Sequence, residues 1–233
     1  SRFISKFSIM HDRHDKAYFD DAAQLQESWV GLLLLEWSKK NTSHEIDLKY
    51  GLQGYNGEDV FGSYKLFNKG SQNWNKKLLF SWSQYRPNWI YEYWSQSNLN
   101  KQTDMSIELG IGYKKNIMFS AGIKQFKDYV YLDSLISVKH TEDIVSVYFA
   151  DLVLDQSFGP LRIRSNFRYT SSDNIVYPYP KFNLKSEVLI DRYYKKRFRY
   201  QIGFEVNYLS GFNTYGYVPA LGLFNVRSGN SSP

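Results

Sequence analysis

The chain has 233 residues, a net charge of +6 and no cysteine, so disulfides and thiolate metal sites are excluded. Aromatic residues make up 18% of the sequence, and 20 of them are Tyr. A dry core would need a hydrogen-bond partner for every buried Tyr hydroxyl, whereas a membrane interface offers water at one end of the ring. Because the charge is mild and no basic run is sustained, a nucleic-acid partner is not expected.

The mean hydropathy of −0.50 does not separate a soluble protein from a membrane protein. No stretch approaches the roughly 20 apolar residues that a membrane-spanning helix requires. A transmembrane β-barrel alternates lipid-facing and lumen-facing residues, so its strands average to a modest hydropathy. The polarity is therefore compatible with a β-barrel as well as with a soluble β-protein.

Taken in chain order, the predicted elements are strands in which apolar and polar residues alternate. The pattern is clearest over residues 43–53, 105–114, 161–170 and 198–209, where one face is apolar and the other polar. With the weaker segments this gives about twelve strands and no helix. The weaker segments are 2–9, 28–39, 59–68, 77–86, 117–127, 142–156, 181–194 and 217–227.

Short and long connections alternate between these strands, as in an up-and-down barrel with turns at one rim and loops at the other. The strands of roughly 10 to 14 residues are long enough to cross a bilayer. We therefore predict an all-β fold, an antiparallel up-and-down transmembrane β-barrel, as a single domain over residues 1–233 in a bacterial outer membrane. Short connections are expected near 40–42, 68–76, 114–116, 159–160 and 195–197, and mostly longer ones at 10–27, 55–58, 87–104, 128–141, 171–180 and 210–216. The segments 55–58 and 68–76 fit this alternation least well.

Large aromatic residues near the segment ends predict a girdle at the membrane interfaces. The alternative is that aromatic residues simply favour strands. The predicted strands are long enough to cross a bilayer, which favours the girdle. The residues predicted for it are Trp29, Trp37, Trp82, Trp89, Tyr193 and Tyr194.

The polar faces are predicted to line the lumen, because charges spaced by two residues cannot lie in an apolar core without many partners. A row of Arg162, Arg164 and Arg168 would make one wall basic and favour anionic solutes. The alternative is a structural ladder in which these residues pair with acids across strands. The predicted lumen-lining residues are Glu45, Asp47, Lys49, Glu108, Lys124, Arg162, Arg164, Arg168, Lys185, Glu187, Asp191, Arg199 and Glu205.

The search for catalytic motifs finds no nucleophile elbow, phosphate-binding loop, dinucleotide fingerprint or zinc-protease helix. No catalytic residue, metal site or cofactor is predicted, and an enzyme is not expected. The polar run His11–Asp15 is interpreted as part of a solvated loop rather than as a cation site.

Two segments carry a resemblance to a known family. The run Gln26-Glu-Ser-Trp-Val-Gly-Leu and the closing Gly211-Phe-Asn-Thr-Tyr-Gly-Tyr-Val-Pro-Ala-Leu-Gly-Leu-Phe, set among long Tyr- and Trp-rich strands, resemble the porins of Bacteroidetes outer membranes. The resemblance spans most of the chain and implies a larger barrel, of which this would be the C-terminal portion. It carries over no catalytic residues. The tail Ser-Gly-Asn-Ser-Ser-Pro departs from the aromatic-terminated last strand that is common in such barrels.

Two functions follow as hypotheses. The first is a channel for passive diffusion of small polar or anionic solutes, with the loop 87–104 or 10–27 folded inward as a constriction. The second is a non-conducting barrel that acts as a scaffold or as a subunit of a secretion or uptake assembly. The expected partners are outer-membrane lipid and lipopolysaccharide, together with a homo-oligomer or such an assembly. A soluble ligand-binding barrel is disfavoured, because it would have eight strands with apolar residues inside.

Overall fold

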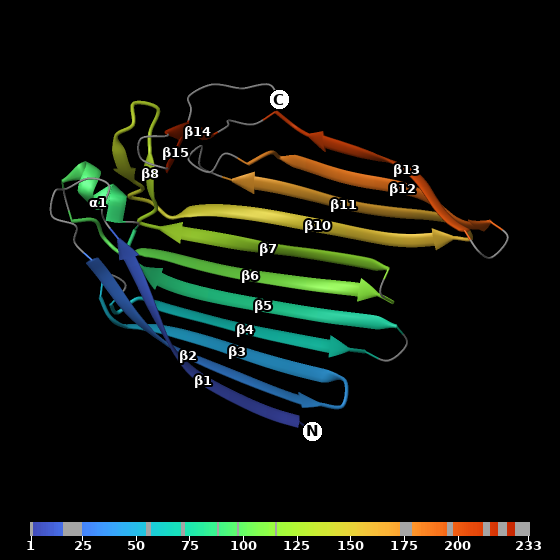
Figure 1. Cartoon of the computed structure of the whole chain (residues 1–233), viewed down its shortest axis with the longest axis horizontal. Helices are drawn as coiled ribbons and strands as arrows, with labels where there is room; N and C mark the ends of the chain where they lie inside the picture. Colours follow the sequence, from blue (N-terminus) through green and yellow to red (C-terminus); the bar gives the residue numbers. More distant parts are fainter. Residues whose placement is uncertain are drawn as a thin grey trace.

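Eleven long strands form one antiparallel sheet in the computed structural model (Figure 1). Each strand pairs with its neighbour in the chain, except that β10 follows β7 directly, because β8 and β9 lie in a separate sheet. The structure describes residues 2–15, 25–54, 57–70, 73–87, 89–96, 98–114, 116–172, 179–194, 198–211, 215–218 and 223–226. The long strands are β1 (Arg2–Asp15), β2 (Leu25–Lys39), β3 (Thr42–Gln53), β4 (Val60–Lys69), β5 (Trp74–Tyr85), β6 (Gln102–Tyr113), β7 (Ile117–Lys127), β10 (Val145–Phe158), β11 (Leu161–Ser172), β12 (Phe182–Tyr194) and β13 (Phe198–Leu209).

These strands confirm eleven of the twelve predicted segments and the all-β, antiparallel fold class. The shortest has 10 residues and the longest 15, so each reaches the 9 to 11 tilted residues needed to span a bilayer. Within the described residues, β1 and β13 each pair on one side only. The sheet is therefore open, and its single antiparallel layer is consistent with the wall of a barrel.

The alternation of short and long connections is also confirmed. In Figure 1 the tight hairpins of β2–β3, β6–β7 and β10–β11 lie at one end of the sheet, and the longer connections gather at the other. Tight turns need a left-handed backbone, which is found at Lys40 (φ 52°), Lys114 (φ 53°) and Gly159 (φ 61°). We call the two ends of the sheet the turn end and the loop end.

The segment 217–227 differs from the prediction of one strand. Two short antiparallel strands are found there instead: β14 (Tyr215–Val218), which begins two residues before the predicted segment, and β15 (Leu223–Val226). Pro219 comes directly after β14 and has no N–H to donate to a ladder, which breaks the run that the sequence pattern suggested.

The loop end also contains structure that the sequence did not predict. The expectation of no helix is wrong, because α1 (Trp89–Ser95) forms within the predicted loop 87–104. The predicted loop 128–141 holds a hairpin of β8 (Val130–Leu132) and β9 (Val138–His140), which joins β15 and β14 in a second, four-stranded sheet. No helix in the described part of the chain is long and apolar enough to cross a membrane.

The predicted loop 10–27 is shorter than expected. Strand β1 continues through the run His11–Asp15, which pairs residue by residue with Leu25–Trp29 of β2. Backbone pairing in a hairpin does not depend on apolar side chains, so a polar run can extend a strand beyond a membrane. The placement of His11–Asp15 in a loop was therefore wrong.

Candidate functional site

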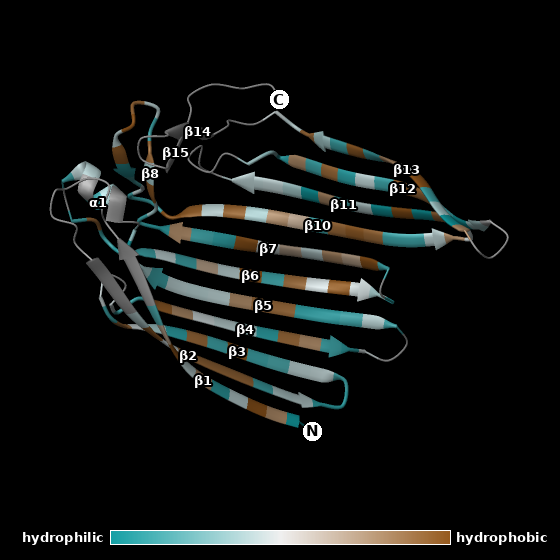
Figure 2. Cartoon of the chain, viewed as in Figure 1, coloured by the Kyte–Doolittle hydropathy of each residue, from teal (hydrophilic) through white to brown (hydrophobic). Residues whose placement is uncertain are grey.

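The register of the large sheet sorts its side chains into two faces, which we call the polar face and the apolar face. Cross-strand partners share a face, so Glu45, Lys65 and Leu79 on β3, β4 and β5 belong to the same face as Glu108 on β6. Figure 2 shows the resulting alternation of hydrophilic and hydrophobic residues along the strands. All of the residues predicted to line a lumen lie on the polar face: Glu45, Asp47, Lys49, Glu108, Lys124, Arg162, Arg164, Arg168, Lys185, Glu187, Asp191, Arg199 and Glu205.

The apolar face carries large hydrophobic side chains that no layer of the described structure covers. Phe7 on β1 is 71% exposed, Leu109 on β6 60%, and Ile202 on β13 66%. Only four hydrophobic residues of the described part of the chain are buried, namely Val130, Leu132, Val145 and Val147. Soluble monomers rarely expose so large a continuous apolar surface, whereas a barrel presents one to lipid.

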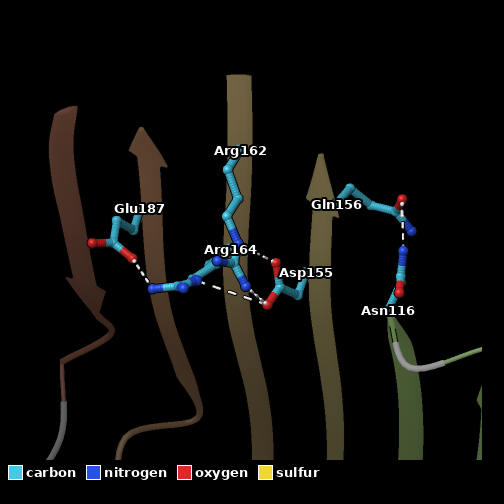
Figure 3. A network of polar contacts seen from close by, with 6 residues as sticks. All are labelled: Asn116, Asp155, Gln156, Arg162, Arg164 and Glu187. Carbon is cyan, nitrogen blue, oxygen red and sulfur yellow. Dashed lines mark hydrogen bonds and ion pairs between the residues drawn. The ribbon is translucent and has the colours of Figure 1, made fainter. Parts of the chain in front are cut away.

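The arginine row of β11 is held by acids on both sides. Arg162 donates to Asp155 through Nε at 2.7 Å and through Nη2 at 2.5 Å. Arg164 lies between two carboxylates, with its Nη1 3.3 Å from Glu187 and its Nε 3.7 Å from Asp155, as Figure 3 shows. Each guanidinium in this part of the row therefore has a compensating charge.

The same pairing continues across β10 to β13. Arg168 makes a two-pronged contact with Asp151, at 2.6 Å and 2.8 Å. Farther along, Lys185 lies 3.2 Å from Glu205, and Arg199 pairs with Asp191. On these four strands the polar face carries five basic and five acidic residues, so the contacts form a ladder without net charge. The five bases are Arg162, Arg164, Arg168, Lys185 and Arg199, and the five acids are Asp151, Asp155, Glu187, Asp191 and Glu205.

On β3 to β7 the polar face has fewer ion pairs than on β10 to β13. Lys65 contacts Glu45 at 2.5 Å and Lys77 contacts Glu108 at 2.8 Å. Lys124 instead lies over the ring of Phe149, with 5.8 Å between its Nζ and the ring centre. The polar face is thus a water-compatible surface in which most charges are matched locally.

Only some of the residues predicted for the aromatic girdle lie on the apolar face of the sheet. Trp37 lies on the apolar face of β2, and Trp82 lies on that of β5. The register between β2 and β3 shifts at Trp29, but its pairing with His11 of β1 places Trp29 on the apolar face as well. Tyr193 pairs with Arg199, so it belongs to the polar face, where the guanidinium lies 5.8 Å from the ring centre. Trp89 lies in α1, outside the sheet, because the loop that carries it is helical. The side chains of Trp89 and Tyr194 are outside the described residues.

Sequence reasoning missed Trp74, which the register puts on the apolar face at the turn end of β5. Trp74 and Trp82 are eight residues apart, as are Trp29 and Trp37 on β2. Eight steps correspond to about 27 Å along a strand. The recurrence of Trp at this spacing was the signal that could have identified Trp74.

At the loop end, α1 and the β8–β9 hairpin form what we call the cap, residues 86–101 and 128–144 (Figure 1). Trp94 of α1 donates to the Ile136 carbonyl oxygen at 2.9 Å, which ties the helix to the hairpin. Val145 and Val147, on the polar face of β10, are each 2% exposed at this end. On β10 the polar face is therefore buried at the loop end and open farther along the strand, where Val153 is 42% exposed.

Beside the cap lie one buried carboxyl group, Asp59, and one half-buried carboxyl group, Asp104. Asp59 is 5% exposed; it accepts a hydrogen bond from the Arg86 backbone N–H at 3.1 Å and lies 3.7 Å from Lys101 Nζ. Burial raises the pKa of Asp59, and the backbone hydrogen bond and Lys101 oppose this rise. Asp104 accepts a hydrogen bond from the Tyr85 hydroxyl at 3.0 Å, while its Oδ1 is buried without a partner.

Comparison with known proteins gives one family. A family model with the description "Putative porin" matches residues 24–232, which is nearly the whole chain. No curated protein matches the sequence. Membership of a porin family suggests an outer-membrane channel, and the long antiparallel strands with one apolar face agree with that location. The chain therefore belongs to this porin family.

Proposed function

We propose that the chain forms a wall of an outer-membrane channel for passive diffusion of small polar solutes. The observation that carries the proposal is the separation of faces over eleven strands, with matched charges on one face and exposed apolar side chains on the other. In a barrel of this kind the apolar face meets lipid and the polar face meets water. The aromatic residues at both ends of the apolar face suit the two membrane interfaces.

The ladder on β10 to β13 supports weak charge selectivity rather than a preference for anions. Selectivity from a charged wall requires cations that no carboxylate compensates. Arg162, Arg164 and Arg168 all contact Asp155 or Asp151. We therefore propose that polarity and size, more than charge, decide which solutes pass.

The cap is the observation that favours the second candidate, a non-conducting barrel that serves as a scaffold or assembly subunit. Val145 and Val147 are buried on the polar face at the end of the sheet where the cap lies, and a cap across the whole lumen would stop diffusion. A constriction that covers only part of the lumen would limit solute size instead. Conduction distinguishes these two possibilities.

The test is single-channel recording of the full-length protein in a planar lipid bilayer, with Arg164→Glu as the variant. The wild type should give stable current steps with nearly equal permeability to small cations and anions. Arg164→Glu puts a third carboxylate beside Asp155 and Glu187, so its reversal potential should shift towards cation preference. The matched control is Lys39→Glu, the same change of charge at an exposed position on the apolar side of β2.

Stable insertion without current steps would contradict the channel and favour the scaffold. A strong anion preference in the wild type would contradict the balanced ladder. Equal shifts in Arg164→Glu and Lys39→Glu would show that Arg164 does not face the conducting path.

A further inference from the structure

A groove of about 440 Å³ lies on the polar face where β11, β12 and β13 approach the loop end. The register arranges its lining residues in two cross-strand rows on one face. Adjacent strands are about 4.8 Å apart and successive rows about 6.7 Å apart, so the rows form a grid on the scale of one sugar ring. The first row is Asn166, Lys185 and Asn207, and the second is Arg168, Asn183 and Leu209.

The two cations in the groove are already compensated. Arg168 uses Nε and Nη2 on the two carboxylate oxygens of Asp151. Lys185 lies 3.2 Å from Glu205, which also accepts a hydrogen bond from Asn207 at 2.7 Å. An anionic solute would have to compete with Asp151 and Glu205 for these groups, which reduces its advantage over a neutral one.

The amides supply the unused hydrogen-bonding capacity. Within the described part of the chain, the side chains of Asn166 and Asn183 make no hydrogen bond, and Asn166 is exposed. A carboxamide offers two donor hydrogens and an acceptor oxygen, and a hydroxyl group can both donate and accept. Asn166 and Asn183 lie on neighbouring strands in successive cross-strand rows. Their two amides therefore match a ligand that carries several neighbouring hydroxyl groups.

We propose that this groove is a binding subsite for neutral, hydroxyl-rich solutes of the size of a short oligosaccharide, with Asn166 and Asn183 as the main recognition groups. The inference deepens the proposed channel function and rests on it, since the groove meets solutes only if the polar face lines a water-filled path. Weak binding here would raise the local concentration of such solutes without trapping them.

The experiment is isothermal titration of the full-length protein, folded in detergent, with maltotriose and, separately, with the anionic trisaccharide trigalacturonate. Maltotriose should bind weakly. Asn166→Ala and Asn183→Ala should each lower its affinity about fivefold, as expected for the loss of one hydrogen bond to a neutral group. The matched control is Gln201→Ala, which lies on the same face of β13 but six residues from Asn207, outside the groove.

Three results would overturn the inference: no heat of binding with maltotriose, equal affinity in the two Asn variants and the wild type, or tighter binding of trigalacturonate than of maltotriose. A second measurement, block of the single-channel current by maltotriose, separates the groove proposal from the channel proposal. Current steps that maltotriose does not block, together with no titration signal, contradict the groove and leave the channel standing. Asn-dependent titration in a protein that gives no current steps supports the groove and contradicts the channel.

Discussion

At the scale of single residues, Gly122 on β7 leaves room for an aromatic side chain of the neighbouring strand on the polar face. The Phe149 ring lies over Gly122 from the neighbouring strand β10, and a Cβ added at Gly122 would lie 2.6 Å from Phe149 Cζ and also against the Ile107 carbonyl oxygen. Gly122→Ala should therefore lower the free energy of unfolding by about 1–3 kcal/mol, measured by urea unfolding from lipid vesicles.

Gly31→Ala on β2 is the control for Gly122→Ala. The nearest atom to its added Cβ is Leu52 Cδ1 at 3.8 Å, an ordinary contact, so its effect should stay within about 0.5 kcal/mol. Equal effects of the two variants would contradict the packing of Phe149 on Gly122.

Asp59 gives a pH dependence at the loop end. Burial raises its pKa in the folded state, so its contribution to stability is fully present below the pKa of the unfolded chain and is lost as the pH rises through the folded-state pKa. The Gly51 and Glu58 amides donate to the Asp59 and Gly51 carbonyl oxygens. Their hydrogen exchange should therefore become faster, beyond the intrinsic increase, as the pH rises above the ordinary aspartate pKa of about 4.

Asp59→Asn should remove this excess pH dependence, because the amide keeps an acceptor for the Arg86 N–H but does not titrate. Glu58→Gln is the control, since the Glu58 side chain is 79% exposed and should leave the dependence unchanged. An excess pH dependence that persists in Asp59→Asn would assign it to another group.

At the scale of elements, burial at the loop end, where the cap lies, accounts for the apolar residues on both faces of β10. Val145 and Val147 are buried on the polar face at the loop end, whereas Val153 on the same face is exposed. Val147→Asp would bury a carboxylate without a partner, which is far more costly than the same change at an exposed site. We expect it to open the cap and to raise the rate of proteolysis within residues 128–144 at least about tenfold.

Val153→Asp, six residues along the same face, is the matched variant and should leave the rate of proteolysis near that of the wild type. Channel recordings of the same pair add a second readout, because an opened cap should increase the conductance of Val147→Asp alone. Similar proteolysis of the two variants would contradict the burial of β10 by the cap.

The elements also differ in how far the sequence could predict them. β3 and β6 have one apolar and one polar face, so a period of two was enough to find them. β8 and β9 have three residues each, too few for a period to be read. Helix α1 has seven residues, about two turns, and is held by contacts such as Trp94 to Ile136 that local sequence does not encode.

At the scale of the whole molecule, the sequence predicts which residues share a face of the sheet, but not which of them form ion pairs across strands. Which residues share a face follows from parity along each strand, so the candidate lumen residues could be chosen from the sequence. Whether Arg164 meets Glu187 or only water depends on the register between β11 and β12, which turn geometry and packing set together. For this reason the sequence alone does not distinguish a basic wall from a ladder of ion pairs.

The proposed function requires that the polar face lines a water-filled path and that the apolar face meets lipid. The 233 residues contain no cysteine, so single cysteines can be introduced one at a time. The most direct measurement is the labelling of cysteines at successive positions 165–168 of β11, in the full-length protein in outer membranes, with a membrane-impermeant thiol reagent. Labelling is expected at Asn166 and Arg168, whereas Ser165 and Phe167 should be protected and react only with a lipid-soluble reagent. Equal labelling at all four positions, or labelling at Ser165 and Phe167 instead, would contradict it.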